Sequence, residues 1–416
     1  MSVPSASALA FAESVRSTVE AMEPELVAFR RDLHAHPELS RTEHRTTERV
    51  SSRLAAAGLD VRLLTGTGLT CDIGPGGERQ PRRLIALRAD LDALPLTETS
   101  GVDFASTVRG VTHACGHDLH TTILLGAGLV LKELIDSGEL DADVRLVFQP
   151  AEEVQPGGAL DLLRAGVMDG VSQVFALHCD PKLDAGQVGT RIGPITSACD
   201  TLTVTLSSTG GHTSRPHLTG DVVHALGQVI THVPALLNRR IDPRAGVNLT
   251  WGSVRAGNAP NAIPSVGTVS GTLRCLDARV WEHAQDLLGQ IVEQVVAPTG
   301  VEVDLQIVPG VPPVDNDEHA VRMMDDGARA ALGSDCLQLT EQSLGGEDFG
   351  WYLTQTTGAM ARLGTRTPGG RSYDLHQPDV VFDEAAIAAG VKFLVQTVRH
   401  AAAEPGGRHP GSVRRK

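Results

Sequence analysis

The densest group of chemically active side chains lies in residues 113–120 (HACGHDLH). This run carries three imidazoles, one thiol and one carboxylate. Burying such groups without partners is costly, whereas neutral imidazole and thiolate bind borderline-soft ions such as zinc. The run therefore predicts a metal site in which Cys115 and His117 are ligands.

Further polar groups follow predicted strands. Short apolar strands are expected at 84–87, 144–148 and 174–177, and the residues behind them are Asp90 and Asp92, Glu152 and Glu153, and His178. His376 lies in a loop behind a later strand at 360–363. Because sites in open α/β sheets form outside the carboxyl ends of the strands, we expect these groups to converge in space.

The converging set is large enough for two metal ions that share one ligand. Its candidate ligands are Cys115, His117, Glu153, His178 and His376. Such ions usually lie about 3.5–4 Å apart, and the thiolate of Cys115 is the bridging candidate. Taken alone, Cys115 is better explained as an inert buried thiol and His178 as a core histidine. Their combination with two glutamates favours the metal site.

Adjacent glutamates can divide two tasks. One can bind metal while its neighbour acts as general base towards a metal-activated water. The alternative is a solvated acidic loop, but the apolar strand directly before Glu152 favours burial. Of Asp90 and Asp92, one can orient a ligand imidazole.

Composition excludes several other functions. The 416 residues carry a net charge of −14, which argues against a nucleic-acid partner. No run of about 18 apolar residues indicates a membrane span, and no signal peptide is recognised at the N-terminus; we therefore expect a cytoplasmic protein. The six cysteines are dispersed, which indicates reduced thiols.

The alternation of strands and helices predicts an α/β fold with a mixed, largely parallel sheet and helices on both of its faces. Near residue 188 the pattern changes to strands with one polar face, so we expect an inserted α+β lid domain at 188–306 between catalytic segments 1–187 and 307–416. The expected helices are 14–35, 121–134, 220–239, 279–297 and 383–402, the lid strands are 201–207, 266–273 and 301–308, and the loose termini are 1–12 and 401–416.

Several motifs resemble those of the metal-dependent amidohydrolases of the aminoacylase and carboxypeptidase superfamily. The resemblance is strongest to the branch of N-acyl-amino-acid amidohydrolases, hippurate hydrolases and indole-acetyl-amino-acid hydrolases. The matching segments follow the order of that family and cover nearly the whole chain: 31–40 (RDLHAHPELS), 87–95 (LRADLDALP), 113–118 (HACGHD), 148–153 (FQPAEE) and 346–349 (GEDF).

The resemblance implies a role for each candidate residue. It implies the five metal ligands given above, Glu152 as the catalytic base and Asp92 as the residue that orients the metal site. In the lid it implies that His212 reaches the scissile carbonyl, often that of a neighbouring subunit, and that Asn261 and Arg274 contact the substrate carboxylate. Asn261 could instead shape a turn, and Arg274 could be a surface strand residue.

The expected function is hydrolysis of the amide bond of N-acyl amino acids, with two divalent metal ions as cofactors. Zinc is favoured by the thiolate, and manganese, cobalt or nickel are alternatives. The partners expected are a small-molecule substrate and a second copy of the chain, bound through the lid, with no nucleic acid and no membrane. Rival functions are a dipeptidase or carboxypeptidase, an N-carbamoyl hydrolase, and a silent metal-stabilised binding protein.

Overall fold

The computed structural model describes residues 5–75 and 83–403, which form two compact units. The first unit contains the described residues up to Gly193, then Asn316–Glu341, and the residues from Trp351 onward. The second contains Pro194–Asp315 and Gln342–Gly350. Across the described ranges, none of the helices is both long and apolar enough to cross a membrane.

The first unit is built on an eight-stranded sheet in the order β1-β2-β4-β3-β5-β16-β6-β15. Its central strands β4, β3, β5 and β16 run parallel to their neighbours in this group, as expected for a mixed, largely parallel sheet. The strands are β1 (Val61–Leu63), β2 (Leu69–Ile73), β3 (Leu84–Asp90), β4 (Asp143–Gln149), β5 (Val171–Asp184), β6 (Val188–Thr190), β15 (Leu337–Leu339) and β16 (Thr357–Arg366).

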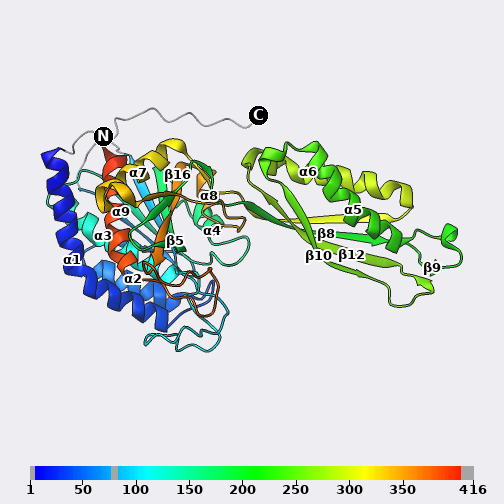
Figure 1. The fold of residues 1–416 in the computed structure, drawn as a ribbon, viewed down its shortest axis with the longest axis horizontal. Coiled ribbons are helices and arrows are strands. Elements are labelled where there is room, and N and C mark those ends of the chain that lie inside the picture. The colour runs from blue at the N-terminus through cyan, green and yellow to red at the C-terminus, as the bar shows by residue number, and fades with distance from the viewer. Residues whose placement is uncertain (1–4, 76–82, 404–416) are drawn as a thin grey trace. The chain divides into compact units, whose positions relative to one another are not determined.

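Several helices of the first unit pack directly on this sheet, and another forms an outer layer (Figure 1). Helices α3 (His117–Asp136), α7 (Glu318–Leu332) and α9 (Ala385–Ala402) contact the strands, and α1 (Ala6–Ala35) packs on α3 and α9. Helix α3 is buried over most of its length because its sequence is apolar on nearly every side. The shorter helices are α2 (His44–Ala56), α4 (Ala159–Arg164) and α8 (Gly350–Leu353).

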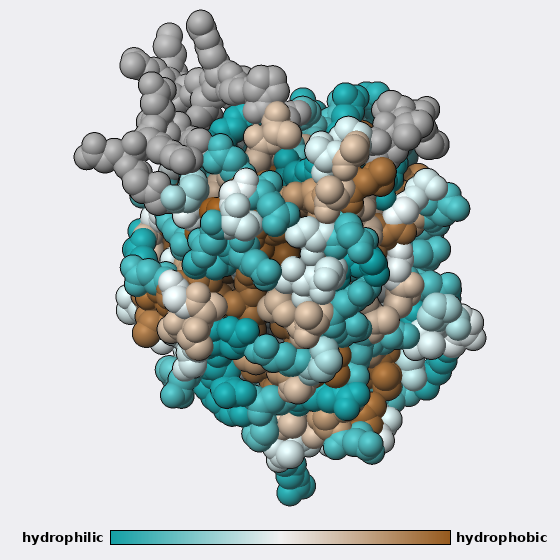
Figure 2. Space-filling view, turned by 90° about the vertical axis from the view of Figure 1, so that its left-hand side faces the viewer, coloured by the Kyte–Doolittle hydropathy of each residue, from teal (hydrophilic) through white to brown (hydrophobic). Residues whose placement is uncertain are grey.

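Helix α1 begins earlier than the sequence pattern predicts. The expectation of a loose terminus through residue 12 is wrong for residues 6–12, because the Ser5 side chain caps the helix by accepting a hydrogen bond from the Ala8 amide at 3.2 Å. Phe11 and Val15 bury the inner face, while Arg16 pairs with Glu20 on the outer face. Figure 2, which views the molecule from the α1 side, shows a mainly hydrophilic surface with scattered apolar groups.

The second unit is an antiparallel four-stranded sheet in the order β10-β12-β8-β13, with two helices on it. Its strands alternate buried and more exposed residues, as expected for a sheet with one wet face. The elements are β8 (Ala198–Ser207), β9 (Gly211–His212), α5 (Val222–Arg240), β10 (Asn248–Ala256), β11 (Ala262–Ile263), β12 (Val266–Cys275), α6 (Ala278–Val296) and β13 (Glu302–Val311). The two-residue strands β7 (Gly193–Pro194) and β14 (Asp315–Asn316) stand where the chain passes between the units.

The bounds of the second unit differ from the predicted insertion at 188–306. Strand β6 pairs with β16 and β15 and so belongs to the first unit. Strand β13 continues its pairing with β8 as far as Val311. A later segment also joins the second unit, because the Ser343 amide donates to the Ile195 carbonyl and the Ser197 hydroxyl donates to the Leu344 carbonyl, both at 2.8 Å.

Candidate metal centre

The Cys115–His117 segment is fixed by a glycine at the start of α3. Gly116 has a φ of 89°, a left-handed conformation that glycine adopts without strain. A Cβ at this position would lie only 2.9 Å from the Cys179 Sγ atom. The turn therefore requires glycine, and it presents Cys115 just before the helix and His117 as its first residue.

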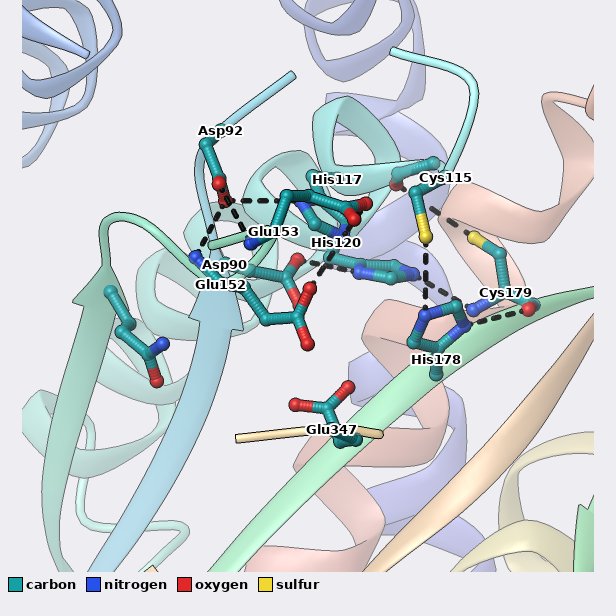
Figure 3. A network of polar contacts seen from close by, with 12 residues as sticks. Asp90, Asp92, Cys115, His117, His120, Glu152, Glu153, His178, Cys179 and Glu347 are labelled. Atoms are coloured by element: carbon teal, nitrogen blue, oxygen red, sulfur yellow. Dashed lines mark hydrogen bonds and ion pairs between the residues drawn. The ribbon is translucent and has the colours of Figure 1, made fainter. Parts of the chain in front are cut away.

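The Glu152–Glu153 turn is held by the Asp92 carboxylate (Figure 3). The Glu152 amide donates to Asp92 Oδ1 and the Glu153 amide donates to Asp92 Oδ2, each at 3.0 Å. The Ser40 hydroxyl also donates to Asp92 Oδ2, at 2.6 Å. Ala151, directly before the two glutamates, has a φ of 58°, which is unusual for a residue other than glycine. This local conformation sets the direction of both glutamate side chains.

The five predicted ligands lie close together in the first unit. The Cys115 Sγ atom is 3.5 Å from His178 Nε2, and Glu153 Oε1 is 3.7 Å from His117 Nε2 and 3.4 Å from His376 Nε2. Several groups of three described residues have potential ligand atoms within 4.8 Å of one another, among them Cys115 with His117 and His178, Cys115 with Glu153 and His376, and His117 with Glu152 and Glu153. Cys115, His117 and Glu153 each belong to two of these three groups.

Unpaired polar atoms mark the same place. The His117 Nε2 atom and the Glu153 Oε1 atom are buried without a hydrogen-bond partner, whereas the other ring nitrogen of His117, Nδ1, faces Asp92 Oδ1 at 3.4 Å. Orphaned buried polar atoms are destabilising, and each needs an explanation. A cation accounts for them, because imidazole nitrogen, carboxylate oxygen and thiolate sulfur together form a ligand set for a divalent transition metal. The residues therefore fit metal ions.

Burial and neighbouring charges shift the pKa values of the candidate ligands in different directions. Burial lowers the pKa of His178 well below its usual range, and the Arg362 charge adds to this effect. Burial and the Glu153 carboxylate raise the pKa of the Cys115 thiol well above its usual range. For His117, burial disfavours the charged ring, but Asp90 and Cys115 raise its pKa well above the usual value. Without metal, burial thus disfavours both the charged ring of His178 and the thiolate of Cys115.

A second layer of buried charge supports the candidate ligands, and of its members only Asp90 was a predicted candidate for such a role. His120 Nδ1 and Asp90 Oδ1 lie 2.7 Å apart, and Arg88 Nη1 donates to Asp90 Oδ2, also at 2.7 Å. Burial would raise the pKa of Asp90, but His117, His120 and Arg88 hold it well below its usual value. The spacing of His117 and His120 could have revealed this layer, because residues three apart share one helix face.

Of the two predicted ligands His178 and His376, the first is placed differently from the expectation, whereas the second lies in a loop behind a strand, as expected. Strand β5 continues to Asp184, so His178 lies within the strand and pairs with Arg362 of β16. The expectation that His178 follows the strand is wrong, because β16 extends the hydrogen-bonded ladder beyond the apolar run. His376 lies in a loop with a φ of 64°, and its amide donates to the Ala114 carbonyl at 3.0 Å.

The three predicted residues of the second unit lie at two separate places within it. His212 in β9 and Asn261 are neighbours, because Ala262 pairs with His212 and the Thr213 amide donates to the Asn261 carbonyl at 3.2 Å. Both residues are exposed. Arg274 lies near the far end of β12, where its Nη1 atom donates to the Leu344 carbonyl at 2.8 Å.

A buried ion network lies next to the ligands. Arg30 Nε is 2.7 Å and His34 Nδ1 is 2.8 Å from Asp118 Oδ2, and His34 Nε2 is 3.2 Å from Glu98 Oε1. Asp118 is the second residue of α3, so this network ties the start of that helix to α1. Burial would raise the pKa of Asp118, but Arg30 and His34 hold it far below its usual range.

The fold and this site define a metal-dependent hydrolase. The model of peptidase family M20/M25/M40 matches residues 86–400, and the chain belongs to this family. Among solved structures, it is similar to one described as an aminohydrolase of Staphylococcus aureus, with a TM-score of 0.88, 28% identity and coverage of 94% of this chain and 100% of that one. It is also similar to a dinuclear metal-binding peptidase of the M20 family from Bacillus subtilis, with a TM-score of 0.80, 30% identity and coverage of 92% and 99%.

Curated relatives include proteins of different length. A Rhodococcus jostii protein described as a glutamate–cysteine ligase is 49% identical over 92% of this chain, but the chain spans only 47% of that protein. An N-acetyl-L-cysteine deacetylase of Bacillus subtilis is 35% identical over 93% of this chain and 90% of its own length. An N-acyl-L-amino acid amidohydrolase of Geobacillus stearothermophilus is 36% identical over 76% and 85%. These relatives and the family identify the chemistry in general as metal-dependent amide hydrolysis with two metal ions.

Proposed function

We propose that this protein hydrolyses the amide bond of N-acyl amino acids and releases a carboxylic acid and a free amino acid. The observation that carries the proposal is the Glu152–Glu153 turn, in which Glu153 belongs to two of the groups of potential ligand atoms named above and Glu152 shares one of them. The names of two relatives, a deacetylase of N-acetylcysteine and an N-acyl-amino-acid amidohydrolase, support this substrate class.

The proposed ligands are Cys115, His117, Glu153, His178 and His376. When bound, two divalent ions supply Lewis acidity for the amide carbonyl and lower the pKa of a water molecule. The thiol of Cys115 favours zinc, with manganese, cobalt and nickel as alternatives. Asp92 positions this set, because its carboxylate contacts the His117 ring and both glutamate amides.

Glu152 is the proposed general base. Its backbone is fixed by Asp92, and its side chain shares a candidate set with His117 and Glu153. It accepts a proton from the attacking water as the new carbon–oxygen bond forms. When the carbon–nitrogen bond breaks, the same carboxyl group returns the proton to the leaving amine. Net, one water is consumed and the amide is divided into an acid and an amine.

The second unit supplies the proposed contacts to the rest of the substrate. His212 is proposed to donate a hydrogen bond to the carbonyl oxygen as negative charge develops there. Arg274 and Asn261 are proposed to bind the carboxylate of the amino acid, because a guanidinium matches a carboxylate in two parallel hydrogen bonds. A homodimer formed through this unit is also proposed, and sedimentation velocity would test it.

The test is amine release from a panel of N-acetyl, N-benzoyl, indole-acetyl and N-carbamoyl amino acids and dipeptides, with N-acetylcysteine included. Protein stripped by a chelator is assayed with zinc, manganese, cobalt or nickel added back. Metal-restored cleavage of N-acyl members supports the proposal, and Glu152→Gln should retain metal while losing turnover. Cleavage confined to dipeptides or carbamoyl substrates, or metal binding without any turnover, would overturn it.

A further inference from the structure

A buried carboxylate behind the Glu152–Glu153 turn has no part in the chemistry above. Glu43 is the N-cap residue of α2 and is 0% exposed, but its side chain makes no hydrogen bond to the helix. Its Oε1 atom accepts hydrogen bonds from the Ala151 amide at 2.8 Å and the Arg41 amide at 2.9 Å. Its Oε2 atom accepts one from the Thr67 hydroxyl at 2.7 Å. One side chain thus joins three segments that are far apart in the sequence.

Two carboxylates therefore hold three consecutive amides of one turn. The Ala151 amide donates to Glu43, and the next two amides, of Glu152 and Glu153, donate to Asp92. Consecutive amides can converge on anions in this way only where the backbone departs from a strand or helix, and Ala151 does so with a φ of 58°. A left-handed alanine persists where its surroundings over-determine it, and the Glu43 hydrogen bond is one such constraint.

Close packing reinforces the same contact. The Thr47 hydroxyl donates to the Glu43 carbonyl at 2.6 Å, and the Gly68 amide donates to that hydroxyl at 2.9 Å. A Cβ on Gly68 would lie 2.6 Å from the Pro150 ring and 2.7 Å from the Phe148 carbonyl. The residues before the two glutamates, Phe148 and Pro150, therefore pack closely against Gly68, which is hydrogen-bonded through Thr47 to Glu43. This close packing leaves little space for the turn to change its conformation.

We propose that Glu43 is a positioning residue that aims the Glu152 base and the Glu153 ligand by fixing the Ala151 turn. The part of the inference that concerns Glu152 as general base rests on the proposed function. The part that concerns Glu153 as metal ligand rests on the geometry of the candidate ligands alone. Glu43 precedes the part of the chain that the family model matches, which begins at residue 86. It acts through backbone amides and does not touch the substrate.

The geometry separates the effect of hydrogen bonding from that of charge. Both backbone amides donate to the same oxygen of Glu43, and its other oxygen faces a hydroxyl, which can donate or accept. In Glu43→Gln the amide oxygen can serve both backbone amides while the NH2 group donates to Thr67. Glu43→Gln should therefore retain the turn, whereas Glu43→Ala should lose it.

Glu38 provides a matched control. Like Glu43, it accepts hydrogen bonds from two backbone amides, those of Arg45 at 3.0 Å and Thr46 at 2.8 Å, and both of these lie in the first turn of α2. Within the described residues its carboxylate makes no hydrogen bond to the 150–153 turn. Glu38→Ala should lower the thermal midpoint as Glu43→Ala does, without the same effect on the turn.

The experiment compares the wild type with Glu43→Ala, Glu43→Gln and Glu38→Ala, each with its metal. We expect Glu43→Ala to lower kcat on the order of 10²-fold with little change in KM, because small displacements of catalytic groups have effects of this size. Glu43→Gln should restore most of this loss, and Glu38→Ala should stay near the wild type. Equal losses of kcat in Glu43→Ala and Glu38→Ala, or a Glu43→Gln as impaired as Glu43→Ala, would overturn the inference.

A second readout does not depend on turnover. Zinc affinity is measured by competition with a chromophoric chelator, and Glu43→Ala should hold one of two ions at least tenfold more weakly than Glu38→Ala, because Glu153 is displaced. Unchanged zinc affinity would contradict the role towards Glu153. If the wild type cleaves no N-acyl amino acid, the proposed function fails, while the zinc comparison still supports or overturns the role of Glu43.

Discussion

His117 presents its Nδ1 atom to Asp92 Oδ1 at 3.4 Å. Its Nε2 atom is thereby left facing the other side of the site, where Glu153 Oε1 lies at 3.7 Å. A histidine ligand commonly donates its second ring N–H to a carboxylate, which fixes the ring and makes the first nitrogen a better donor to metal. If His117 binds metal as proposed, Nε2 is the ring nitrogen available for the ion, because Nδ1 faces Asp92.

Asp92→Asn should weaken metal binding about 10- to 100-fold. Each Asp92 oxygen accepts one glutamate amide, whereas asparagine has a single acceptor oxygen and would turn its NH2 group towards one of these donors. Competition with a chelator measures the change. Asp72→Asn is the control, because Asp72 is half-exposed and pairs with Arg145 on the surface. Equal metal affinity in the two variants would show that Asp92 does not support metal binding.

Replacements of Ala151 should separate backbone strain from packing. Ala151→Gly tolerates a φ of 58° and should change the unfolding free energy by about 1 kcal/mol or less. Ala151→Val places a branched side chain in the same conformation at a fully buried position, and we expect a loss of about 1–3 kcal/mol with lower kcat. Urea unfolding and steady-state kinetics measure both. A valine variant as stable and active as the glycine variant would show that the left-handed turn is not required.

His212 of the second unit has a defined tautomer. Nδ1 of His212 accepts hydrogen bonds from the Ser214 amide at 3.1 Å and lies 2.8 Å from its hydroxyl, so the neutral ring carries its proton on Nε2. Under the proposed function, His212→Ala should lower kcat about 10²- to 10³-fold. His212→Gln, which can place an N–H near the Nε2 position, should lose less than His212→Asn. If kcat is the same in His212→Gln and His212→Asn, the donor is not at Nε2.

The Glu98–His34 pair should make the free energy of unfolding depend on pH, both below pH 4.5 and above pH 6.5. Burial would raise the pKa of Glu98, but hydrogen bonds from His34, Ser100 and the Ser106 amide bring it down to about 2. Its stabilisation, on the order of 3 kcal/mol, is fully present above pH 4.5 and is lost as the pH falls towards 2. For His34, burial lowers the pKa, but Asp118 and Glu98 raise it above 6.5. That contribution is full below pH 6.5 and declines as the pH rises through the raised value.

Urea unfolding of the wild type and Glu98→Gln from pH 2.5 to 7 tests this linkage. The difference in stability between the two proteins should shrink as the pH falls below 4.5. A difference that stays constant across this window would show that Glu98 is not held as a stabilised anion.

Metal binding should release protons. Burial and Glu153 keep the Cys115 thiol protonated, and neighbouring anions favour a proton on His117. Both groups must lose that proton to act as ligands. Zinc affinity should therefore rise with pH, and titration calorimetry in buffers of different ionisation enthalpy should count the protons released. Cys115→Ser should release fewer, and an unchanged number would exclude the thiol as a ligand.

The sequence was sufficient to predict the convergence of the ligands, because that depends on where strands end. Apolar runs before Asp90, Glu152 and His178 indicated a parallel sheet, and the structure brings these segments together as its central strands. The end of β5 was not predicted. Its polar continuation through Asp180 to Asp184 is stabilised by pairing with β16, a contact between residues nearly two hundred positions apart.

The supporting residues were harder to predict. Ser40 lies in a turn and Glu43 at the start of a helix, and neither follows a strand. Yet Ser40 contacts Asp92, and Glu43 contacts the turn that carries the two glutamates. Their partners are more than fifty residues away in the chain, so neither periodicity nor spacing reveals them. Three non-glycine residues with positive φ, Arg41, Ala151 and His376, surround the same site. Such conformations are set by tertiary contacts that have no local signal.

The position of β16 between β5 and β6 has a consequence for synthesis of the protein. A nascent chain that has reached Asp315 contains four candidate ligands but lacks both β16 and His376. Its sheet ends at β5, and this apolar strand then exposes an unpaired edge that invites association with other chains. The set of five candidate ligands is therefore complete only once the segment that carries β16 and His376 has joined the sheet.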